Sequence, residues 1–202
     1  MQRIEINGNR FYEKDGRRYP SVTSILRYYP KGDGFYKWVG SVGKEEAEKI
    51  RDFAGEQGNK VHKAIENYLS NKEIDYDSLS AKESGLVIAF LDWYKDLITE
   101  HKVEVVALEL PVLNEVDGYA GTIDIVLKID QEIWIVDIKT SNYVQTTHKL
   151  QLSAYRHCLL TEDVKLGIIH LKSGKFIEVE DCFDVFLATK KIFDFESTNT
   201  SG

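Results

Sequence analysis

The stretch from residue 121 to residue 140 constrains the fold more than any other part of the chain. It contains two apolar runs, TIDIVLKI and EIWIVDIK, separated by a polar Asp-Gln pair. Runs rich in β-branched residues on either side of such a break are typical of adjacent β-strands joined by a tight turn. The first run nevertheless contains Asp124, and the second contains Asp137 and Lys139. Buried charges are costly unless they are paired or bound to a metal, so these three residues need an explanation.

The register of this predicted hairpin follows from a two-residue turn at the Asp-Gln pair. Counting back along both strands from that turn places Asp124 opposite Asp137. Like charges in directly opposed positions are destabilising. Lys139 is two residues beyond Asp137 and therefore lies on the same face of the strand. The hairpin is thus predicted to gather two carboxylates and one ammonium group on a single patch.

Two interpretations of this patch remain open from the hairpin alone. A divalent cation would remove the repulsion between the carboxylates, and oxygen ligands beside a phosphate suit Mg2+ or Mn2+. Lys139 could then position a water molecule or stabilise charge on a phosphoryl group. Alternatively, Lys139 forms an internal salt bridge with one aspartate, because structural ion pairs are common.

The periodicity of the remaining chain predicts an α/β fold. Extended patterns are expected over residues 3–20, 103–113, 119–129, 132–140 and 164–180, and helical patterns over residues 21–26, 44–69, 81–102, 146–160 and 182–193. The pattern over 44–69 is expected to form two helices, broken near Gly55 or Gly58. The central strands are apolar on both faces, which predicts helices on both sides of the sheet. Strands and helices alternate without βαβ regularity, so a mixed sheet is expected.

The organisation of the chain is expected to be simple. A single domain is predicted over residues 1–193, with a small N-terminal β segment over about residues 1–20, and residues 194–202 are expected to be a flexible tail. No apolar run reaches the roughly 20 residues of a membrane helix, and no signal-peptide pattern is present. The two cysteines suit a reduced compartment, which favours a cytoplasmic location. A net charge of −7 argues against a general polyanion binder but allows a local basic groove.

Two helical segments contain polar pairs at a spacing of four residues, which places each pair on one helix face. In GNKVHKAIENYL the pair is His62 and Glu66, and in QLSAYRHC it is Gln151 and Tyr155. A lone histidine in such a helix is more often a packed or exposed residue than a ligand. An amphipathic helix that covers a sheet explains the second pair equally well.

The ordered motifs GNKVH, GTID, VDIKT and QLSAY together resemble the PD-(D/E)XK nucleases, specifically their RecB-like branch. The segment PSVTSIL additionally resembles the N-terminal part of mitochondrial genome maintenance exonucleases and their phage relatives. This resemblance implies a restriction-endonuclease-like core with a central mixed sheet flanked by helices. It also implies a metal-dependent hydrolase that acts on DNA.

The resemblance assigns roles to the charged residues of the hairpin. Asp124 and Asp137 would be metal ligands with a direct part in catalysis, and Lys139 would be the catalytic lysine. His62 would complete the metal site, which would hold Mg2+ or Mn2+. Many relatives have glutamate where this chain has Asp137. The chain lacks the cysteine quartet that binds an iron–sulfur cluster in some RecB-like nucleases, so no such cluster is expected.

The resemblance also implies supporting residues. Gln151 and Tyr155 match the QxxxY motif, which supports the active site and contacts the nucleic acid. Glu109, in VVALELPV, lies where relatives often have another acidic residue and is a further candidate metal ligand; a surface glutamate on an edge strand is the alternative. Ser21 and Thr23 could contact phosphate through their hydroxyl groups, although helix capping is the interpretation that these residues favour.

Three aromatic residues, Phe35, Tyr36 and Trp38, could stack on bases. Aromatic residues at this spacing more often belong to a core, so they are not assigned to the site.

The resulting functional hypothesis is a Mg2+- or Mn2+-dependent deoxyribonuclease, an exonuclease that acts on single-stranded DNA or DNA ends. It would act in the cytoplasm, or in the host cytoplasm if it is phage-encoded. Two alternatives stay open: an endonuclease or junction-cutting enzyme of the same fold, and a non-catalytic nucleic-acid-binding module that retains the fold.

Overall fold

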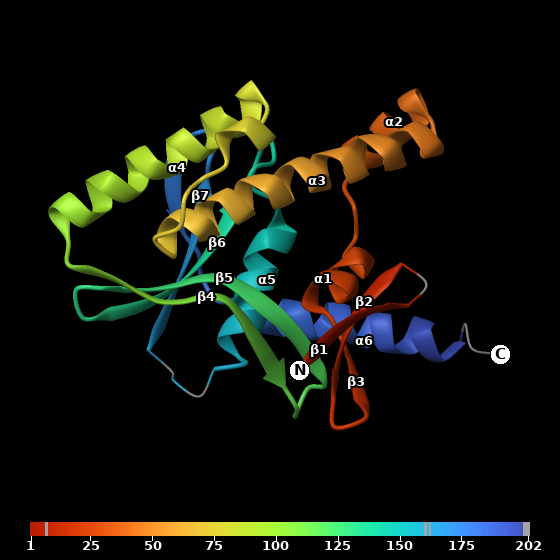
Figure 1. Ribbon diagram of the computed structural model, residues 1–202. Coiled ribbons are helices and arrows are strands. Elements are labelled where there is room, and N and C mark those ends of the chain that lie inside the picture. The colour runs from red at the N-terminus through yellow and green to blue at the C-terminus, as the bar shows by residue number, and fades with distance from the viewer. Residues whose placement is uncertain (7, 160, 162, 200–202) are drawn as a thin grey trace.

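The main sheet is mixed, as the sequence predicts, and its strands follow the order β4-β5-β6-β7-β8 (Figure 1). In this computed structural model, which describes residues 1–6, 8–159, 161 and 163–199, β6 pairs with β7 in parallel and the other neighbouring strands pair antiparallel. The strands are β4 (Val103–Asn114), β5 (Tyr119–Ile129), β6 (Glu132–Lys139), β7 (Val164–His170) and β8 (Lys175–Glu178). A separate antiparallel sheet contains β1 (Gln2–Ile6), β2 (Asn9–Lys14) and β3 (Arg17–Pro20).

The hairpin of β5 and β6 has the predicted register. Ile129 pairs with Glu132 next to the turn, and Ile125 pairs with Val136 further along. Asp130 in the turn has a φ of 55°, a left-handed conformation that a short polar side chain tolerates better than most. Its carboxylate accepts a hydrogen bond of 3.0 Å from the backbone N–H of Lys102, which stabilises this turn against the neighbouring strand.

Helices cover both faces of the main sheet, and two separate hydrophobic clusters result. On one face α3 (Lys44–Leu69) and α4 (Ala81–Glu100) pack against the sheet through residues such as Ile65 and Phe90. On the other face lie α1 (Val22–Ile25), α5 (Thr146–Arg156) and α6 (Phe183–Asn199), with Leu152 and Phe186 completely buried. The α/β architecture with helices on both faces, predicted from strands that are apolar on both sides, is confirmed.

Helix α3 is continuous, so the predicted break near Gly55 or Gly58 is wrong. A glycine inside a helix costs only about 1 kcal/mol relative to alanine, and tertiary packing readily compensates that amount. Gly58 also has a spatial reason to be small. A Cβ atom at this position would lie 3.3 Å from the Thr140 hydroxyl at the end of β6, so the helix passes closely over the strand.

The aromatic residues near position 36 do not belong to the core. They lie on α2 (Asp33–Val42), a helix in which no residue is buried and which packs beside the first part of α3, far from the main sheet (Figure 1). Tyr36 is 61% exposed, and Phe35 contacts only its neighbours Tyr36 and Trp38 among the aromatic pairs of the described chain. The expectation of core packing is therefore wrong at these positions, because α2 has no second layer to pack against.

The C-terminal helix is longer than the sequence pattern predicts. Helix α6 continues to Asn199, so residues 194–199 are helical and do not form the expected flexible tail; residues 200–202 lie outside the described residues. Buried Phe193 packs edge-to-face on Tyr28 with ring centroids 5.3 Å apart, and Lys190 forms an ion pair of 2.6 Å with Asp194. These contacts stabilise the helix beyond the last residue of its apolar pattern. No described helix combines the length and the apolar character needed to cross a membrane.

Candidate active site

Asp124 is held at the end of the β5–β6 ladder. Its Oδ2 atom accepts a hydrogen bond of 3.0 Å from the backbone N–H of Ile138. This bond crosses from β5 to β6 just beyond the paired residues Ile125 and Val136. The carboxylate of Asp124 thus lies against the segment of β6 that contains Asp137 and Lys139. The patch predicted from the hairpin register exists in the structure.

Asp137 is the most deeply buried charge of this patch, with only 2% of its side chain exposed. Its Oδ2 atom lies 2.7 Å from Lys139 Nζ, which forms an ion pair with it. Within the described part of the chain, however, neither carboxylate oxygen receives a well-directed hydrogen bond. Burial raises the pKa of Asp137 above its usual value, the Lys139 ammonium opposes that rise, and the nearby Asp124 adds to it. A buried carboxylate whose oxygens can still accept interactions is suited to bind a cation.

His62, Glu109 and Asp124 come together from three different elements. One ligand atom from each side chain lies within 4.8 Å of the other two, and His62 Nδ1 is 3.5 Å from Asp124 Oδ2. His62 projects from α3, Glu109 from β4 and Asp124 from β5. The structure therefore places His62 beside the hairpin carboxylates. The sequence pattern alone did not predict this proximity; only the family resemblance implied it.

Glu109 has a backbone conformation that is unusual for a strand. Its φ is 46°, in the left-handed region, although its neighbours Leu108 and Leu110 pair normally with Ile125 and Ile123. A non-glycine residue in this region costs about 1–2 kcal/mol, and such residues cluster at functional sites. The side chain keeps solvent contact, yet desolvation in the crowded cleft raises the pKa of its carboxyl group, and the charge of Asp124 raises it further. Glu109 faces the acidic cluster and is not an isolated surface glutamate.

The donor set fits a divalent cation. His62, Glu109 and Asp124 offer one imidazole nitrogen and two carboxylates at close range, and Asp137 adds a buried carboxylate that lacks directed hydrogen bonds among the described residues. Oxygen-rich sets of this kind suit Mg2+ or Mn2+, and the imidazole is better matched to Mn2+.

Gln151 and Tyr155 connect α5 to the lysine. Gln151 Oε1 accepts a hydrogen bond of 3.2 Å from Lys139 Nζ, and Gln151 Nε2 donates one of 3.0 Å to the Tyr155 hydroxyl. Tyr155 is buried, and this burial, followed in size by the charge of Asp124, raises its pKa well above the usual value. The two residues therefore form a polar chain that fixes the position of the Lys139 ammonium.

Gly121 is a positioning residue that the sequence reasoning did not single out. A Cβ atom on Gly121 would lie 2.3 Å from Cε1 of the Tyr155 ring, a distance that real Cβ atoms do not reach. The glycine lets the Tyr155 ring pack directly on the backbone of β5, three residues before Asp124. Gly121 is the glycine of the GTID motif, and this was the feature of the sequence that could have indicated its role.

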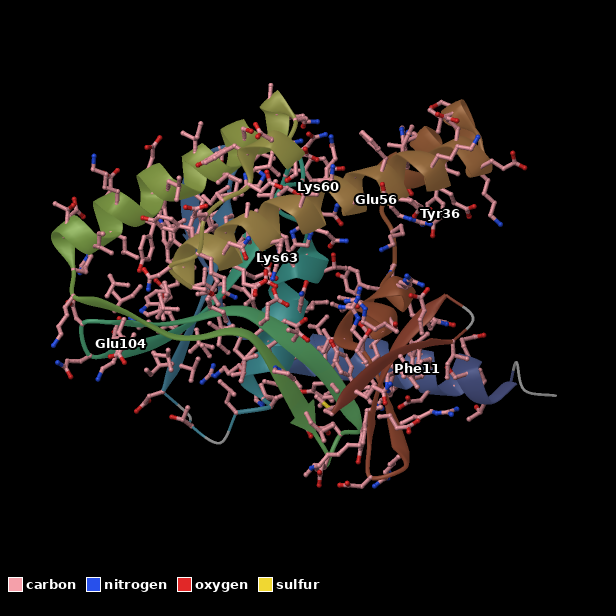
Figure 2. All side chains as sticks on the ribbon, in the orientation of Figure 1. Phe11, Tyr36, Glu56, Lys60, Lys63 and Glu104 are labelled. Atoms are coloured by element: carbon pink, nitrogen blue, oxygen red, sulfur yellow. The ribbon has the colours of Figure 1, made fainter. Side chains whose placement is uncertain are left out.

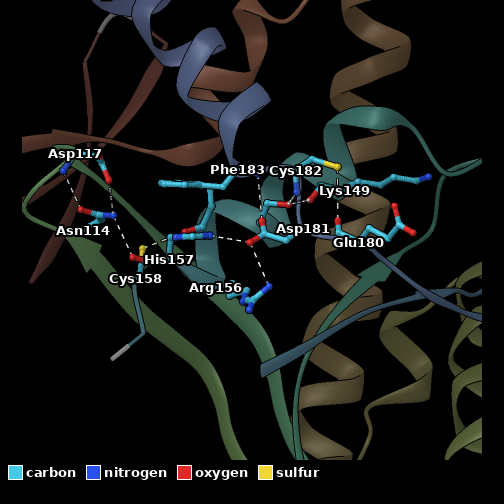
Figure 3. Close-up of polar contacts among 12 residues, drawn as sticks. Asn114, Asp117, Lys149, Arg156, His157, Cys158, Glu180, Asp181, Cys182 and Phe183 are labelled. Carbon is cyan, nitrogen blue, oxygen red and sulfur yellow. Dashed lines mark hydrogen bonds and ion pairs between the residues drawn. The ribbon is translucent and has the colours of Figure 1, made fainter. Parts of the chain in front are cut away.

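The far end of α5 is anchored by a second polar network (Figure 3). Asp181 Oδ2 lies 2.8 Å from His157 Nε2 and 3.2 Å from Arg156 Nη1. Asn114, at the end of β4, donates a hydrogen bond of 3.0 Å to the backbone carbonyl of His157, and the Phe183 ring stacks on the His157 imidazole. These contacts attach α5 to β4 and to the start of α6, so the helix that bears Gln151 is fixed at its C-terminal end.

Ser21 is a helix cap that also borders the site. Its hydroxyl oxygen accepts a hydrogen bond of 3.0 Å from the Ser24 backbone N–H, so the predicted capping role is confirmed. Ser21 is buried, whereas Thr23 is exposed. Both residues line the same cleft as Asp124 and Lys139.

This cleft has a volume of about 330 Å³ and brings together all the predicted site residues. It contains His62, Glu109, Asp124, Asp137, Lys139, Gln151, Tyr155, Ser21 and Thr23. Sequence reasoning missed several other lining residues, among them Arg3, Arg10, Tyr12 and Lys63. Figure 2 shows Lys63 on α3, in the region between this helix and the strands of the main sheet.

Comparison with known proteins gives one informative match. A family model described as the PD-(D/E)XK nuclease superfamily matches residues 35–183. No curated protein sequence matches the chain. The crystal structure of SSO0001 is similar at 17% sequence identity and a TM-score of 0.37, over 71% of this chain and 84% of that chain. A TM-score of this size supports no structural argument. The family match covers more than half of the chain and includes both strands of the acidic hairpin.

Proposed function

Because the chain belongs to the PD-(D/E)XK nuclease superfamily, we propose that it is a Mg2+- or Mn2+-dependent deoxyribonuclease, an exonuclease that hydrolyses phosphodiester bonds in single-stranded DNA or at DNA ends. Nucleases of this superfamily use divalent metals. The observation that carries the proposal is the gathering of Asp124, Asp137 and Lys139 with His62 and Glu109 in one cleft. The motifs QLSAY and PSVTSIL support placement in the RecB-like branch, near the mitochondrial genome maintenance exonucleases and their phage relatives.

The acidic residues would hold the metal. Asp124 and Asp137 would provide the central carboxylates, and His62 and Glu109 would complete the coordination from α3 and β4. A bound divalent cation lowers the pKa of a water ligand and neutralises charge on the scissile phosphate. Burial is the main cause that raises the pKa of Glu109 and Asp137, and the charge of Asp124 adds to it; binding would remove this repulsion among the three carboxylates.

Lys139 would act on the nucleophile or on the charge that develops at the phosphate. Its ammonium is held by Asp137 at 2.7 Å and by Gln151 at 3.2 Å, so its position is restricted before substrate binds. A donor placed in advance stabilises a transition state without reorganisation at the moment of reaction. Gln151 and Tyr155 would be positioning residues, since they act through Lys139.

The experiment is cleavage of labelled single-stranded DNA in the presence of Mg2+ or Mn2+. Linear substrates with free or blocked ends, labelled at the 5′ or the 3′ end, are compared with circular single-stranded DNA. The proposal predicts metal-dependent release of nucleotides from free ends and no cutting of the circle. Cutting of the circle would instead identify an endonuclease. Binding without any cutting in either metal would identify a non-catalytic module that retains the fold.

A further inference from the structure

One face of the N-terminal sheet borders the cleft and contains two arginines. Arg3 pairs with Tyr12 across β1 and β2, and Arg10 lies two residues before Tyr12 on the same strand. Cross-strand partners and residues two apart share a face. Arg3, Arg10 and Tyr12 therefore lie on one face of the sheet, and all three line the cleft that contains Asp124 and Lys139.

Tyr12 fastens this face to the catalytic strand. Its hydroxyl group forms a hydrogen bond of 2.8 Å with the Thr122 hydroxyl. Thr122 lies two residues before Asp124 on β5, and Tyr12 itself is buried. The arginines that flank Tyr12 are thus attached to the strand that bears a proposed metal ligand, and the N-terminal sheet forms part of the cleft wall.

Neither guanidinium group has a partner of its own in the part of the chain that the structure describes. No side-chain hydrogen bond or ion pair involves Arg3 or Arg10 among these residues, although Glu5 is the cross-strand partner of Arg10. Arg18, on the other face of the same sheet, is different because it forms an ion pair of 3.2 Å with Glu13. Arg3 also lies close enough to Glu109 to oppose, in small part, the rise in the pKa of that carboxyl group that burial and Asp124 cause.

Unpaired guanidinium groups beside a metal-binding acidic centre are suited to bind a polyanion that extends from the metal to the arginines. In a protein with a net charge of −7, the placement of positive charge decides where a phosphate backbone binds. Arginine matches the geometry of phosphate oxygens through its planar fork of donors. On the opposite wall of the cleft, Lys63 and Asn59 of α3 offer further donors, although Lys63 also pairs with Glu66 at 2.8 Å.

We propose that Arg3 and Arg10 form a phosphate-binding pair, which holds a backbone phosphate of the nucleic-acid strand next to the one that is cut. The N-terminal sheet is therefore a substrate-binding element. This inference rests on the proposed nuclease function. The bound nucleic-acid strand would then run from the acidic centre along the face of β1 and β2, between Tyr12 and α3.

The test measures how DNA binding depends on salt. Variants Arg3→Ala, Arg10→Ala and the double variant are prepared in an Asp124→Asn background, and a labelled single-stranded oligonucleotide is titrated by fluorescence anisotropy at several salt concentrations. Each phosphate contact contributes about 0.7 to the slope of log affinity against log salt for a single strand. Because the two arginines share one phosphate, the double variant should flatten the slope by about 0.7, and each single variant should flatten it by only part of that amount. Arg10→Lys should retain most of the slope because it keeps the charge.

Arg18→Ala is the matched control, because it removes one arginine from the same sheet but from the face away from the cleft. Its slope should equal that of the parent, and all variants should melt at nearly the parent temperature. If the Arg3 and Arg10 variants match Arg18→Ala while the wild-type protein cuts DNA, the phosphate pair is wrong and the nuclease function stands. If Arg3→Ala leaves the salt slope unchanged and, in the wild-type background, changes only the dependence of cleavage on metal concentration, Arg3 offsets the charge of Glu109 and does not bind phosphate. If the wild-type protein neither binds nor cuts DNA, the proposed function and this inference fail together.

Discussion

The Lys139 ammonium lies 2.7 Å from the Asp137 carboxylate, which is almost completely buried. This contact is compatible with both interpretations that the sequence leaves open, a stabilising ion pair and a catalytic lysine beside a metal ligand. A buried ion pair is weak support for stability, because the cost of desolvation can exceed the Coulombic gain. The surroundings favour the second interpretation, since Gln151 also holds the ammonium and three further potential ligands lie around the same cleft.

Replacement of Asp124 tests the metal centre. Asp124→Asn should reduce cleavage by more than the roughly 10- to 100-fold that loss of a supporting residue costs at a metal site. The fold should persist, because the asparagine carbonyl can still accept the hydrogen bond from the Ile138 N–H. The melting temperature without metal should be unchanged or higher, since one of the crowded carboxylates is neutralised. Cleavage is measured under saturating Mg2+ beside a melting curve; near-wild-type cleavage would show that Asp124 is not a ligand.

His62 is tested through metal preference. His62→Ala should weaken metal-supported cleavage. Imidazole is the better ligand for Mn2+, but the loss should be larger in Mg2+, because Mg2+ demands a near-ideal octahedral ligand set and Mn2+ tolerates an incomplete one more readily. The measurement is a titration of each metal against the initial rate of cleavage. Identical titration curves for variant and parent would return His62 to the role of an ordinary helix residue.

Gly121 is predicted to be irreplaceable by alanine. A Cβ atom at Gly121 would lie 2.3 Å from the Tyr155 ring, so Gly121→Ala should destabilise the protein by about 1–3 kcal/mol through overpacking. The displaced Tyr155 should also lose its bond with Gln151, which lowers activity in the folded fraction. Gly85→Ala is the control, because Gly85 is exposed on α4 and nothing lies within 4 Å of the added atom. That change should be neutral or stabilising by up to about 1 kcal/mol. Equal effects at the two glycines would contradict the close approach.

The start of α4 gives a prediction about pH. Hydrogen bonds from the Ser80 backbone N–H and hydroxyl to Glu83 lower the pKa of Glu83 below its usual range. A depressed pKa contributes stability above the unfolded-state value, and this contribution is lost as the pH falls through the folded-state value. Glu83→Gln should therefore lower the melting temperature at pH 7 and make little difference well below pH 4. Glu48→Gln, at an exposed residue of α3, serves as the control. A deficit of the Glu83 variant that persists unchanged into acid would contradict the capping account.

Much of the fold follows from local patterns, and the exceptions have physical causes. The β5–β6 hairpin was predictable because a short turn and two apolar runs determine the register, and with it the position of Asp124 near Asp137. The continuity of α3 could not be predicted, because the contact that explains Gly58 inside the helix is made with the end of β6, which is far away in the sequence.

The candidate site was predictable where residues lie on the hairpin and only partly elsewhere. Glu109 has a positive φ that no residue type at that position signals, and its place beside Asp124 depends on the pairing of β4 with β5. The bond between Tyr12 and Thr122 joins residues 110 positions apart, so nothing local announces that the N-terminal sheet borders the cleft. Arg3 and Arg10 look like ordinary surface arginines until that bond is known.

The most direct test of the account replaces Lys139, because this residue separates a catalytic site from a stabilising ion pair. Lys139→Ala is examined by two measurements, the melting temperature in saturating Mg2+ and single-turnover cleavage of bound single-stranded DNA. If a metal neutralises Asp137, melting should be nearly unchanged and the cleavage step should collapse, since an interaction made mainly in the transition state has been removed. If Lys139 is only the partner of buried Asp137, the variant should lose about 3–5 kcal/mol of stability while its folded fraction still cleaves DNA. The first result is the one that the structure predicts, and the second would contradict it.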